Sequence, residues 1–254
     1  MIDFTGRTAL VTGSSRGIGA AIARRLAALG ATVAVHYRED RVAGEATVGD
    51  LTGDGHMLVG ADIGDPDAVG RMVAQVVAAL GGIDVLVNNA GAYRRHPLDE
   101  VSYEAWRQAW SDTLSTNLVG AANLTWCVAR HMIDGGRTGR IVNVSSRGAF
   151  RGEPDHPAYG ASKAGLNSMS QSLAQHLAPH GITVTAVAPG FVETDMAAPL
   201  LAGPGGDAIR GQSPLGRVAT ADEVADVVAF LASDRAVITT GAIVDANGAS
   251  YLRT

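Results

Sequence analysis

A glycine-rich loop near the start of the chain is the feature that most constrains its fold. Residues 8–12 form a short apolar run, TALVT, and residues 13–19, with the sequence GSSRGIG, follow at once. Residues 20–29 then have a helical pattern. Glycine permits a sharp turn, a close approach of backbone N–H groups to a diphosphate, and tight packing of a helix on a strand. The order of strand, glycine loop and helix is typical of the first unit of a nucleotide-binding fold.

Apolar runs of strand length alternate with helical patterns along the rest of the chain. This alternation predicts a parallel sheet with helices on both faces. We therefore expect an α/β fold of the Rossmann type, a doubly wound parallel sheet formed by a single domain over residues 1–254. The predicted strands are residues 8–12, 32–37, 56–60, 84–87, 140–144, 182–188 and 242–245. The predicted helices are residues 20–29, 66–80, 102–132, 157–177 and 220–232, with an irregular to helical segment at 193–212.

Composition and charge argue against several classes of protein. The chain has 254 residues, of which 46% are hydrophobic, and this is ample for one sizeable core. Its net charge of −5 and its lack of a basic run argue against a nucleic-acid partner. No stretch of about 20 apolar residues occurs, so we expect no membrane span. A single cysteine, Cys127, and an N-terminus without the pattern of a signal peptide favour a cytoplasmic protein.

Polar or glycine-rich positions follow four of the predicted strands. They are Gly13, Asn88, Ser146 and Pro189. In an open parallel sheet, ligands bind beyond the carboxyl ends of the strands, and these four positions meet at that edge. Asn88 could line a cofactor cleft there, or it could brace the edge of the sheet. The convergence of four strand ends indicates a site more strongly than any one of them.

Tyr159 and Lys163 form a second constellation within the predicted helix Pro157–Leu177. Their i and i+4 spacing places both side chains on one face of the helix. Of the 20 lysines and arginines, 19 are arginines, and the single lysine is Lys163. A compact ammonium group favours a neighbouring phenolate, so we expect Lys163 to lower the pKa of Tyr159 and prepare it for proton transfer. The alternative is a solvated pair on the helix surface.

The end of the second predicted strand bears on the choice of cofactor. Enzymes that use NAD usually place an acidic residue there to bind the ribose hydroxyls. The sequence instead reads HYR at residues 36–38, and acids follow only at Glu39 and Asp40. Arg16 and Arg38 could flank the 2′-phosphate of NADP, because guanidinium groups suit phosphate oxygens. We therefore expect NADP(H), with NAD(H) as the alternative.

Taken together, the motifs resemble the short-chain dehydrogenase/reductase family, in its single-domain branch. These motifs are TGSSRGIG at residues 12–19, NNAG at 88–91, Asn117, Ser146, Tyr159, Lys163, and Pro189-Gly190 with Thr194. They occur in the order and spacing of the family from about residue 5 onward. The ending GAIVDANG at 241–248 resembles 3-oxoacyl-carrier-protein reductases and glucose dehydrogenases. Two departures are Ala249, where a second glycine is common, and RGA at 147–149, where a more apolar run is usual.

The resemblance implies a role for each catalytic residue. Tyr159 would be the general acid in reduction and the base in oxidation, and Lys163 would bond the nicotinamide ribose. Ser146 would stabilise the developing alkoxide; it is chosen over Ser145 because its 13-residue interval to Tyr159 matches the family. Asn117 would hold a water that connects Lys163 with solvent.

The resemblance also implies the residues that contact cofactor and substrate. Asp62 could accept a hydrogen bond from adenine, or it could cap a turn. The expected cofactor-binding residues are Gly13, Ser15, Arg16, Gly17, Ile18, Gly19, Tyr37, Arg38, Asp62, Ile63, Asn89, Ala90, Gly91, Tyr159, Lys163, Pro189, Gly190, Val192 and Thr194. The expected substrate-binding residues are Ser146, Phe150, His156, Phe191 and Met196. Residues 193–216 are expected to form a mobile lid.

We therefore expect an NADP(H)-dependent oxidoreductase that interconverts a carbonyl and a secondary alcohol. A nucleotide-sensing protein of the same fold and an NAD-dependent alcohol dehydrogenase are the alternatives; an epimerase or dehydratase would need a larger C-terminal region. The substrate stays open among a 3-oxoacyl thioester on a carrier protein, a sugar, a steroid and a polyketide intermediate. No metal is expected, because His176 and His180 have no evident third ligand. The resemblance implies a homo-oligomer, a tetramer or a dimer.

Overall fold

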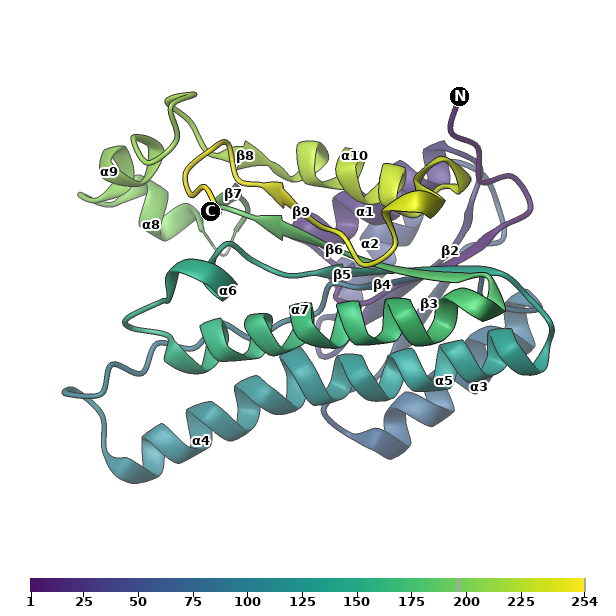
Figure 1. The fold of residues 1–254 in the computed structure, drawn as a ribbon, viewed down its shortest axis with the longest axis horizontal. Coiled ribbons are helices and arrows are strands. Elements are labelled where there is room, and N and C mark those ends of the chain that lie inside the picture. Colours follow the sequence, from purple (N-terminus) through teal and green to yellow (C-terminus); the bar gives the residue numbers. More distant parts are fainter. Residues whose placement is uncertain (196, 254) are drawn as a thin grey trace.

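Seven parallel strands form one sheet in the computed structural model, which describes residues 1–195 and 197–253 (Figure 1). The strand order is β3-β2-β1-β4-β5-β6-β9, and each neighbouring pair is parallel. The strands are β1 (Thr8–Val11), β2 (Thr32–Tyr37), β3 (Met57–Gly60), β4 (Val85–Asn88), β5 (Gly139–Val144), β6 (Ile182–Pro189) and β9 (Ile243–Ala246). The order reverses between β1 and β4, the point at which such sheets open a ligand crevice. The predicted α/β, doubly wound fold is confirmed.

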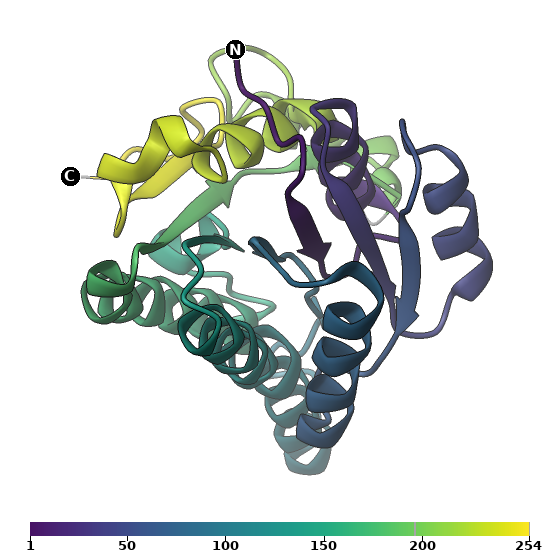
Figure 2. The ribbon, with the colours of Figure 1, turned by 90° about the vertical axis from the view of Figure 1, so that its right-hand side faces the viewer.

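Helices cover both faces of this sheet, as the turned view in Figure 2 shows. One face carries α1 (Gly17–Ala28) and α10 (Ala221–Leu231). The opposite face carries α3 (Pro66–Leu80), α5 (Ala121–Asp134) and α7 (Pro157–Leu177). The sheet is therefore enclosed on both sides, and a ligand can reach it only at an end.

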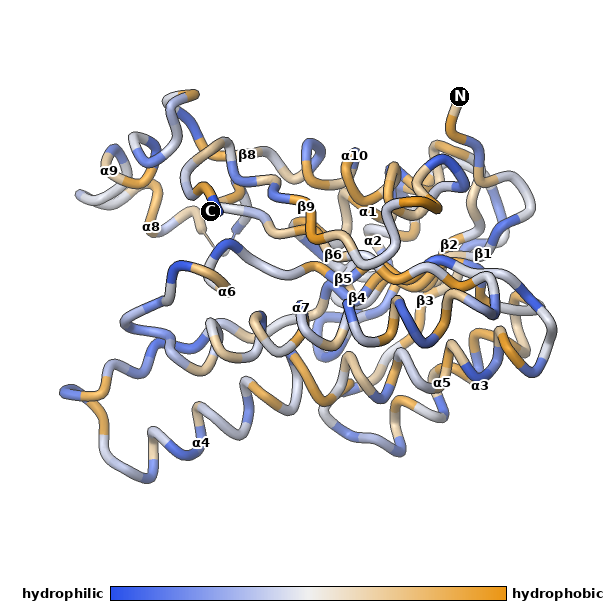
Figure 3. The backbone as a smooth tube through the Cα atoms, viewed as in Figure 1, coloured by the Kyte–Doolittle hydropathy of each residue, from blue (hydrophilic) through white to orange (hydrophobic). Residues whose placement is uncertain are grey.

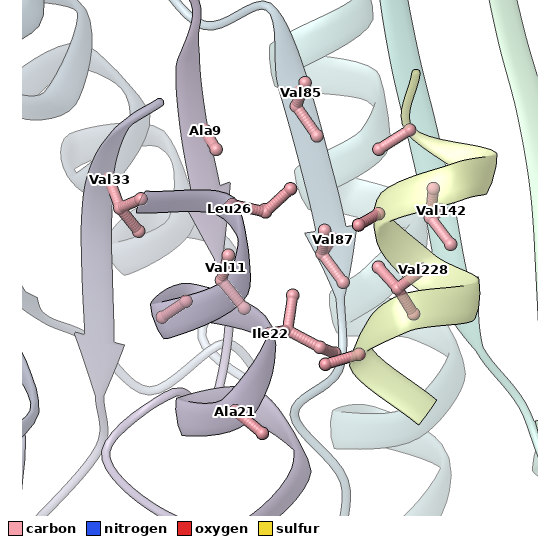
Figure 4. Close-up of a cluster of buried hydrophobic side chains, with 14 of the residues drawn as sticks. Ala9, Val11, Ala21, Ile22, Leu26, Val33, Val85, Val87, Val142 and Val228 are labelled. Carbon is pink, nitrogen blue, oxygen red and sulfur yellow. The ribbon is translucent and has the colours of Figure 1, made fainter. Parts of the chain in front are cut away.

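Successive side chains of each strand enter different apolar cores. In β1, Ala9 and Val11 belong to the cluster beneath α1 and α10, whereas Leu10 belongs to the cluster beneath α3, α5 and α7. Ile22 of α1 and Val228 of α10 point toward the sheet in the close-up of the first cluster (Figure 4). Burial on both faces explains the continuous apolar runs of the strands, which appear orange in Figure 3. Each fully buried leucine or isoleucine stabilises the fold by about 1.5–3 kcal/mol.

The longest helix that the sequence pattern did not predict lies near the N-terminal half of the sheet. α2 (Arg41–Gly49) lies between β2 and β3, where no helix was predicted. Its N-cap is Asp40, whose carboxylate accepts a hydrogen bond from the Ala43 backbone N–H at 3.0 Å. The helix is only nine residues long and buries only Gly44 and Thr47, so it adds little to the core.

The long helix predicted over residues 102–132 is divided by a change of backbone geometry. α4 (Tyr103–Leu114) leads into a π-helical turn, Ser115–Gly120, and α5 follows directly. Such π-turns inside helices occur frequently at functional sites. The predicted catalytic residue Asn117 lies in this turn.

Several short elements lie beyond the carboxyl ends of β5 and β6, at the left of Figure 1. They are α6 (Gly148–Arg151), β7 (Val192–Glu193), α8 (Ala198–Ala202), α9 (Gly206–Arg210) and β8 (Ala219–Thr220). A small separate core of Ala197, Leu201 and Val218 holds this region together. Short 3-10 turns at Ala178–His180 and Asp234–Thr239 complete the chain. Among the helices of the described residues, none has the length and apolar character needed to cross a bilayer.

Candidate active site

A cleft of about 740 Å³ opens at the carboxyl ends of the strands, where the four polar strand ends were expected to meet. Its size falls within the range of small-molecule and cofactor sites. Nearly all the predicted cofactor-binding residues line it: Gly13, Ser15, Arg16, Gly17, Ile18, Gly19, Arg38, Asp62, Ile63, Asn89, Ala90, Gly91, Tyr159, Lys163, Pro189, Gly190, Val192 and Thr194. Ser146 and Phe191 of the predicted substrate set line it as well.

The glycine loop has the geometry of a diphosphate cradle. Gly13 has a left-handed φ of 60°, and a Cβ atom there would lie 2.9 Å from the Cα atom of Ala90. Helix α1 begins at Gly17, and its N-cap, Arg16, makes no side-chain capping bond. The first backbone N–H groups of α1 are therefore left for an anion, at the positive end of the helix dipole. These residues fit the diphosphate of a dinucleotide.

His36 fixes the position of this loop, a role that the sequence did not reveal. Its Nδ1 accepts a hydrogen bond from the Gly13 backbone N–H at 2.9 Å. Its Nε2 lies 3.0 Å from the carbonyl oxygen of Ala61, so the ring is the neutral tautomer with its proton on Nε2. Burial lowers the pKa of His36 and favours this neutral form. One buried imidazole thus connects the glycine loop with the end of β3.

The end of β2 carries a positive and a negative side chain, Arg38 and Glu39, that bear on the choice between NADP and NAD. Arg38 lines the cleft, and its Nη2 forms an ion pair with Glu39 at 2.7 Å. The other nearby acid, Asp40, is occupied as the N-cap of α2. Tyr37, which was expected to bind cofactor, has its side chain outside the cleft wall, because its ring packs over Gly60.

Hydrogen bonds show what two polar residues with alternative predicted roles do in the folded chain. Asn88 braces the sheet: its Nδ2 donates to Thr125 Oγ1 at 2.9 Å and to Asn143 Oδ1 at 2.8 Å. Asp62 caps a turn, because its Oδ1 accepts from the Gly64 N–H at 2.9 Å, and it also lines the cleft.

Ser146 and Tyr159 lie together at the floor of the cleft. The Ser146 Oγ accepts the backbone N–H of Gly148 at 3.0 Å, which fixes the hydroxyl at the end of β5. Burial raises the pKa of Tyr159 above its usual value, and a hydrogen bond with the Ser146 side chain acts in the opposite direction. The phenol is therefore protonated at neutral pH. This corrects the expectation of a lowered pKa, because the cost of burying a phenolate dominates.

Lys163 is buried behind Tyr159 rather than bonded to its hydroxyl. Its Nζ donates to the carbonyl oxygen of Val144 at 2.8 Å and lies 5.7 Å from the centre of the Tyr159 ring. Burial lowers the pKa of Lys163 to about 8. The only lysine of the chain is thus a cation at neutral pH that titrates unusually early.

Asn117 is buried next to Gly91 and does not itself line the cleft. Its Oδ1 accepts the Ala92 N–H at 2.7 Å, and its Nδ2 donates to Ala92 O at 3.0 Å and Ser162 Oγ at 3.1 Å. A Cβ atom on Gly91 would lie 3.5 Å from Asn117 Oδ1 and 3.7 Å from Lys163 Nζ. Asn117 and Lys163 therefore meet at one glycine, which is compatible with the predicted relay.

Phe150 and His156 do not reach the cleft wall. Phe150 lies beneath Arg253, whose Cζ is 4.5 Å from the centre of its ring. His156 stacks on Tyr93 at 3.8 Å, and Tyr93 in turn meets Tyr159 edge to face at 4.7 Å. Of the other predicted substrate residues, Met196 lies outside the described residues.

Several residues of the cleft wall were not assigned to the site from the sequence, and three of them lie near Ser146 and Tyr159. They are Tyr93, Arg147 and Glu153. Arg147 was noted only as a departure from an apolar run, and Tyr93 and Glu153 lie in loops without periodicity. The position of Arg147 directly after Ser146 in the sequence was the one signal that could have assigned it to the site. Tyr93 and Glu153 are brought to the cleft wall by tertiary contacts, which the sequence pattern does not show.

Comparison with known proteins identifies the family. The model of a family described as enoyl-(acyl carrier protein) reductase matches residues 13–248. The 3-oxoacyl-(acyl-carrier-protein) reductase FabG of Staphylococcus aureus strain Mu50 is 40% identical over 252 residues, which span 97% of this chain and 98% of the relative. The chain belongs to the short-chain dehydrogenase/reductase family. It is therefore an oxidoreductase of a family that uses a nicotinamide cofactor.

Two further relatives support membership in the short-chain dehydrogenase/reductase family. The 3-oxoacyl-(acyl-carrier-protein) reductase FabG of Escherichia coli strain K12 is 39% identical over 251 residues, which span 99% of this chain and all 100% of that protein. A dehydrogenase/reductase from Sinorhizobium meliloti 1021 has a similar crystal structure, with a TM-score of 0.88 and 35% identity over 98% of this chain and 97% of that chain. The resemblance stated from the motifs is thus confirmed over nearly the whole chain.

Proposed function

We propose that the chain is an NADPH-dependent reductase that converts a ketone into a secondary alcohol. The observation that carries this proposal is a protonated phenol, Tyr159, in contact with Ser146 inside the cleft that holds the glycine loop. Reduction of a carbonyl requires a proton donor at the oxygen, and a phenol with a raised pKa retains its proton for that purpose. The raised pKa supports reduction as the working direction.

Each catalytic side chain has one task in this reaction. The cleft residues would hold a nicotinamide cofactor, whose chemistry when bound would be donation of a hydride to the carbonyl carbon. Ser146 Oγ donates a hydrogen bond to the carbonyl oxygen and stabilises the negative charge that develops there. Tyr159 then transfers its phenolic proton to that oxygen. Lys163 places a fixed positive charge behind the phenol, which stabilises the tyrosinate that remains until the proton is replaced.

The preference for NADPH rests on the end of β2. Both acids that follow this strand are engaged, Glu39 with Arg38 and Asp40 with the N-terminus of α2. Arg38 and Arg16 line the cleft with exposed side chains, in positions from which they can hold a 2′-phosphate. A phosphate would compete with Glu39 for Arg38 through charge-assisted hydrogen bonds, which are stronger for a doubly charged anion.

Replacing Arg38 by alanine is expected to weaken NADPH binding roughly 10- to 100-fold, the effect of one lost hydrogen bond to a charged group. The binding of NADH should change little, so the ratio of the two dissociation constants is the informative quantity. Titration of cofactor fluorescence measures both constants. Arg41→Ala is the matched control, because Arg41 is a neighbouring exposed arginine that pairs with Glu45 and does not line the cleft. Equal weakening of both cofactors would contradict the assignment.

We also propose that residues 193–216 act as a lid, that the protein is cytoplasmic, and that it assembles as a homo-oligomer. Ala197 and Leu200 of the lid segment line the cleft. Large apolar side chains are exposed along α4, the π-helical turn and α5, namely Tyr103, Val119 and Trp126, and such a surface is suited to pairing with a second copy.

Consumption of NADPH with a panel of ketones and acyl thioesters tests the proposed function. The panel includes 3-oxoacyl thioesters, because the similar FabG proteins are named as 3-oxoacyl-(acyl-carrier-protein) reductases. It also includes cyclic ketones and sugars. Turnover of any carbonyl supports the proposal. Tight binding of NADPH without oxidation by any carbonyl would instead favour a nucleotide sensor, and turnover of enoyl thioesters alone would favour reduction of a carbon–carbon double bond.

A further inference from the structure

The residue after the catalytic serine is a buried arginine that forms no ion pair within the part of the chain that the structure describes. Arg147 is only 4% exposed, yet it lines the cleft together with Ser146 and Tyr159. Among the ion pairs of residues 1–195 and 197–253, none includes Arg147. Burial of a guanidinium is costly unless an anion compensates its charge. A second observation shows where that anion belongs.

Two arginines converge on one uncharged oxygen at this wall. The Oε1 of Gln212 accepts a hydrogen bond from Arg147 Nη2 at 2.6 Å and from Arg151 Nη1 at 3.3 Å. The other bond of the Arg147 guanidinium goes to the hydroxyl of Ser250 at 2.6 Å. A carboxylate is the ligand whose charge and geometry match such a pair of guanidinium groups. A neutral amide oxygen occupies this place in the chain.

The positive charge of Arg147 lies close to three other side chains that line the cleft, Phe191, Tyr93 and Glu153. Its Cζ atom lies 5.1 Å from the ring centre of Phe191, which also lines the cleft. Burial raises the pKa of both Tyr93 and Glu153, and the Arg147 charge opposes that shift at each of them. Glu153 is the carboxyl group that acts on Arg147 and Arg151 here, so these three side chains together have one positive charge in excess.

We infer that the ketone reduced by this protein carries a carboxylate, which Arg147 binds while Ser146 and Tyr159 hold the carbonyl. This inference rests on the proposed function and specifies its substrate class. A substrate anion would take the place beside Arg147 that the Gln212 oxygen now fills. Because Gln212 belongs to the lid segment, the same exchange would release one contact that ties the lid to the serine loop.

A pairwise comparison of acids with their esters tests the inference. The probes are pyruvate, acetoacetate and levulinate, each measured against its methyl ester with NADPH. The three acids cover increasing separations between carbonyl and carboxylate. For at least one pair, the acid should have a kcat/KM roughly 10- to 100-fold above that of the ester, the effect of a hydrogen bond to a charged group.

Variants of Arg147 separate recognition from a structural role. Arg147→Met should bring the ratio of acid to ester close to one, whereas Arg147→Lys should retain part of it, because the charge remains and the fork geometry is lost. Gln212→Glu should also abolish the ratio, since an internal carboxylate would occupy the anion position. The control Arg71→Met, at an exposed arginine on α3, should leave the ratio unchanged. A purely structural role for Arg147 would lower the rates of acid and ester alike and would overturn the inference.

Calorimetric binding to the complex with NADP keeps this test independent of turnover. If no ketone is reduced but the acid of one pair binds more tightly than its ester, in a manner that Arg147→Met abolishes, the inference stands and the proposed reaction fails. If ketones are reduced but acids and esters behave alike in both assays, the reaction stands and the inference fails. Absence of binding by every probe acid would also overturn it.

Discussion

Replacing Tyr159 by phenylalanine is expected to lower kcat roughly 100- to 10,000-fold, the range over which a positioned general acid accelerates proton transfer. The substitution removes only the hydroxyl, so the ring keeps its edge-to-face contact with Tyr93 at 4.7 Å. The diphosphate cradle lies on other elements, and Tyr159→Phe retains the aromatic ring, so the dissociation constant of NADPH should change much less than kcat. Steady-state rates and a fluorescence titration of NADPH measure the two quantities separately.

Tyr103→Phe is the matched control for this experiment. Tyr103 is an exposed tyrosine at the start of α4, and it does not line the cleft. Its substitution should leave both kcat and NADPH binding at the values of the unmodified protein. Near-full turnover by Tyr159→Phe would show that another group protonates the product, and the assignment of Tyr159 as the acid would be wrong.

Replacing Lys163 by arginine is expected to lower kcat at least roughly 100-fold, although the formal charge is retained. Lys163 is 3% exposed, and its compact Nζ fits between the Val144 carbonyl and the Tyr159 ring. A guanidinium is larger and planar, so it would overpack this space, at a cost of about 1–3 kcal/mol in stability. Thermal unfolding and turnover measure the two effects independently.

The pH dependence of the unmodified protein gives the same site a second test. Burial lowers the pKa of Lys163 to about 8, so its ammonium charge is present below that pH and is lost above it. The raised pKa of Tyr159 keeps the phenol protonated through the same window. We therefore expect kcat/KM for reduction to fall as pH rises through about 8. The residual activity of Lys163→Arg should lack this fall, because a guanidinium does not titrate there.

Lys163→Met distinguishes charge from packing in this account. Methionine is flexible and fits the buried space without the ammonium, so it should reproduce the loss of rate with a smaller loss of stability. A turnover of Lys163→Arg close to that of the unmodified protein would contradict the requirement for a compact charge. A pH profile unchanged by the substitution would assign the titration near pH 8 to a group other than Lys163.

The layered fold could be predicted because its signals are local. The inner strands β1, β4, β5 and β6 are buried on both faces, so their apolar runs are continuous. The glycine motifs directly follow strands in the sequence. Helix α2 was missed because it buries only Gly44 and Thr47, and its start depends on a single cap, Asp40. Its nine residues include two glycines, which lower the helix propensity of the segment.

The chemistry of the site depends on burial, which the sequence does not state. The spacing of Tyr159 and Lys163 placed them together, but it predicted the wrong direction for the pKa of Tyr159, because the cost of burying the phenolate was not considered. His36 likewise became visible only through its bonds to Gly13 and Ala61. The partners of Arg147 lie 65 and 103 residues away, at separations where residue spacing carries no signal.

Transfer of deuterium from the cofactor tests the central claim most directly. The protein is incubated with a reactive ketone and NADPH that carries deuterium on the transferable position of the nicotinamide ring, and the product is examined by mass spectrometry and NMR. The account predicts one deuterium on the carbinol carbon, with the rate of incorporation greatly reduced in Tyr159→Phe. Two results would contradict it: tight cofactor binding without deuterium in any alcohol product, or deuterium only in the saturated thioesters formed from enoyl thioesters.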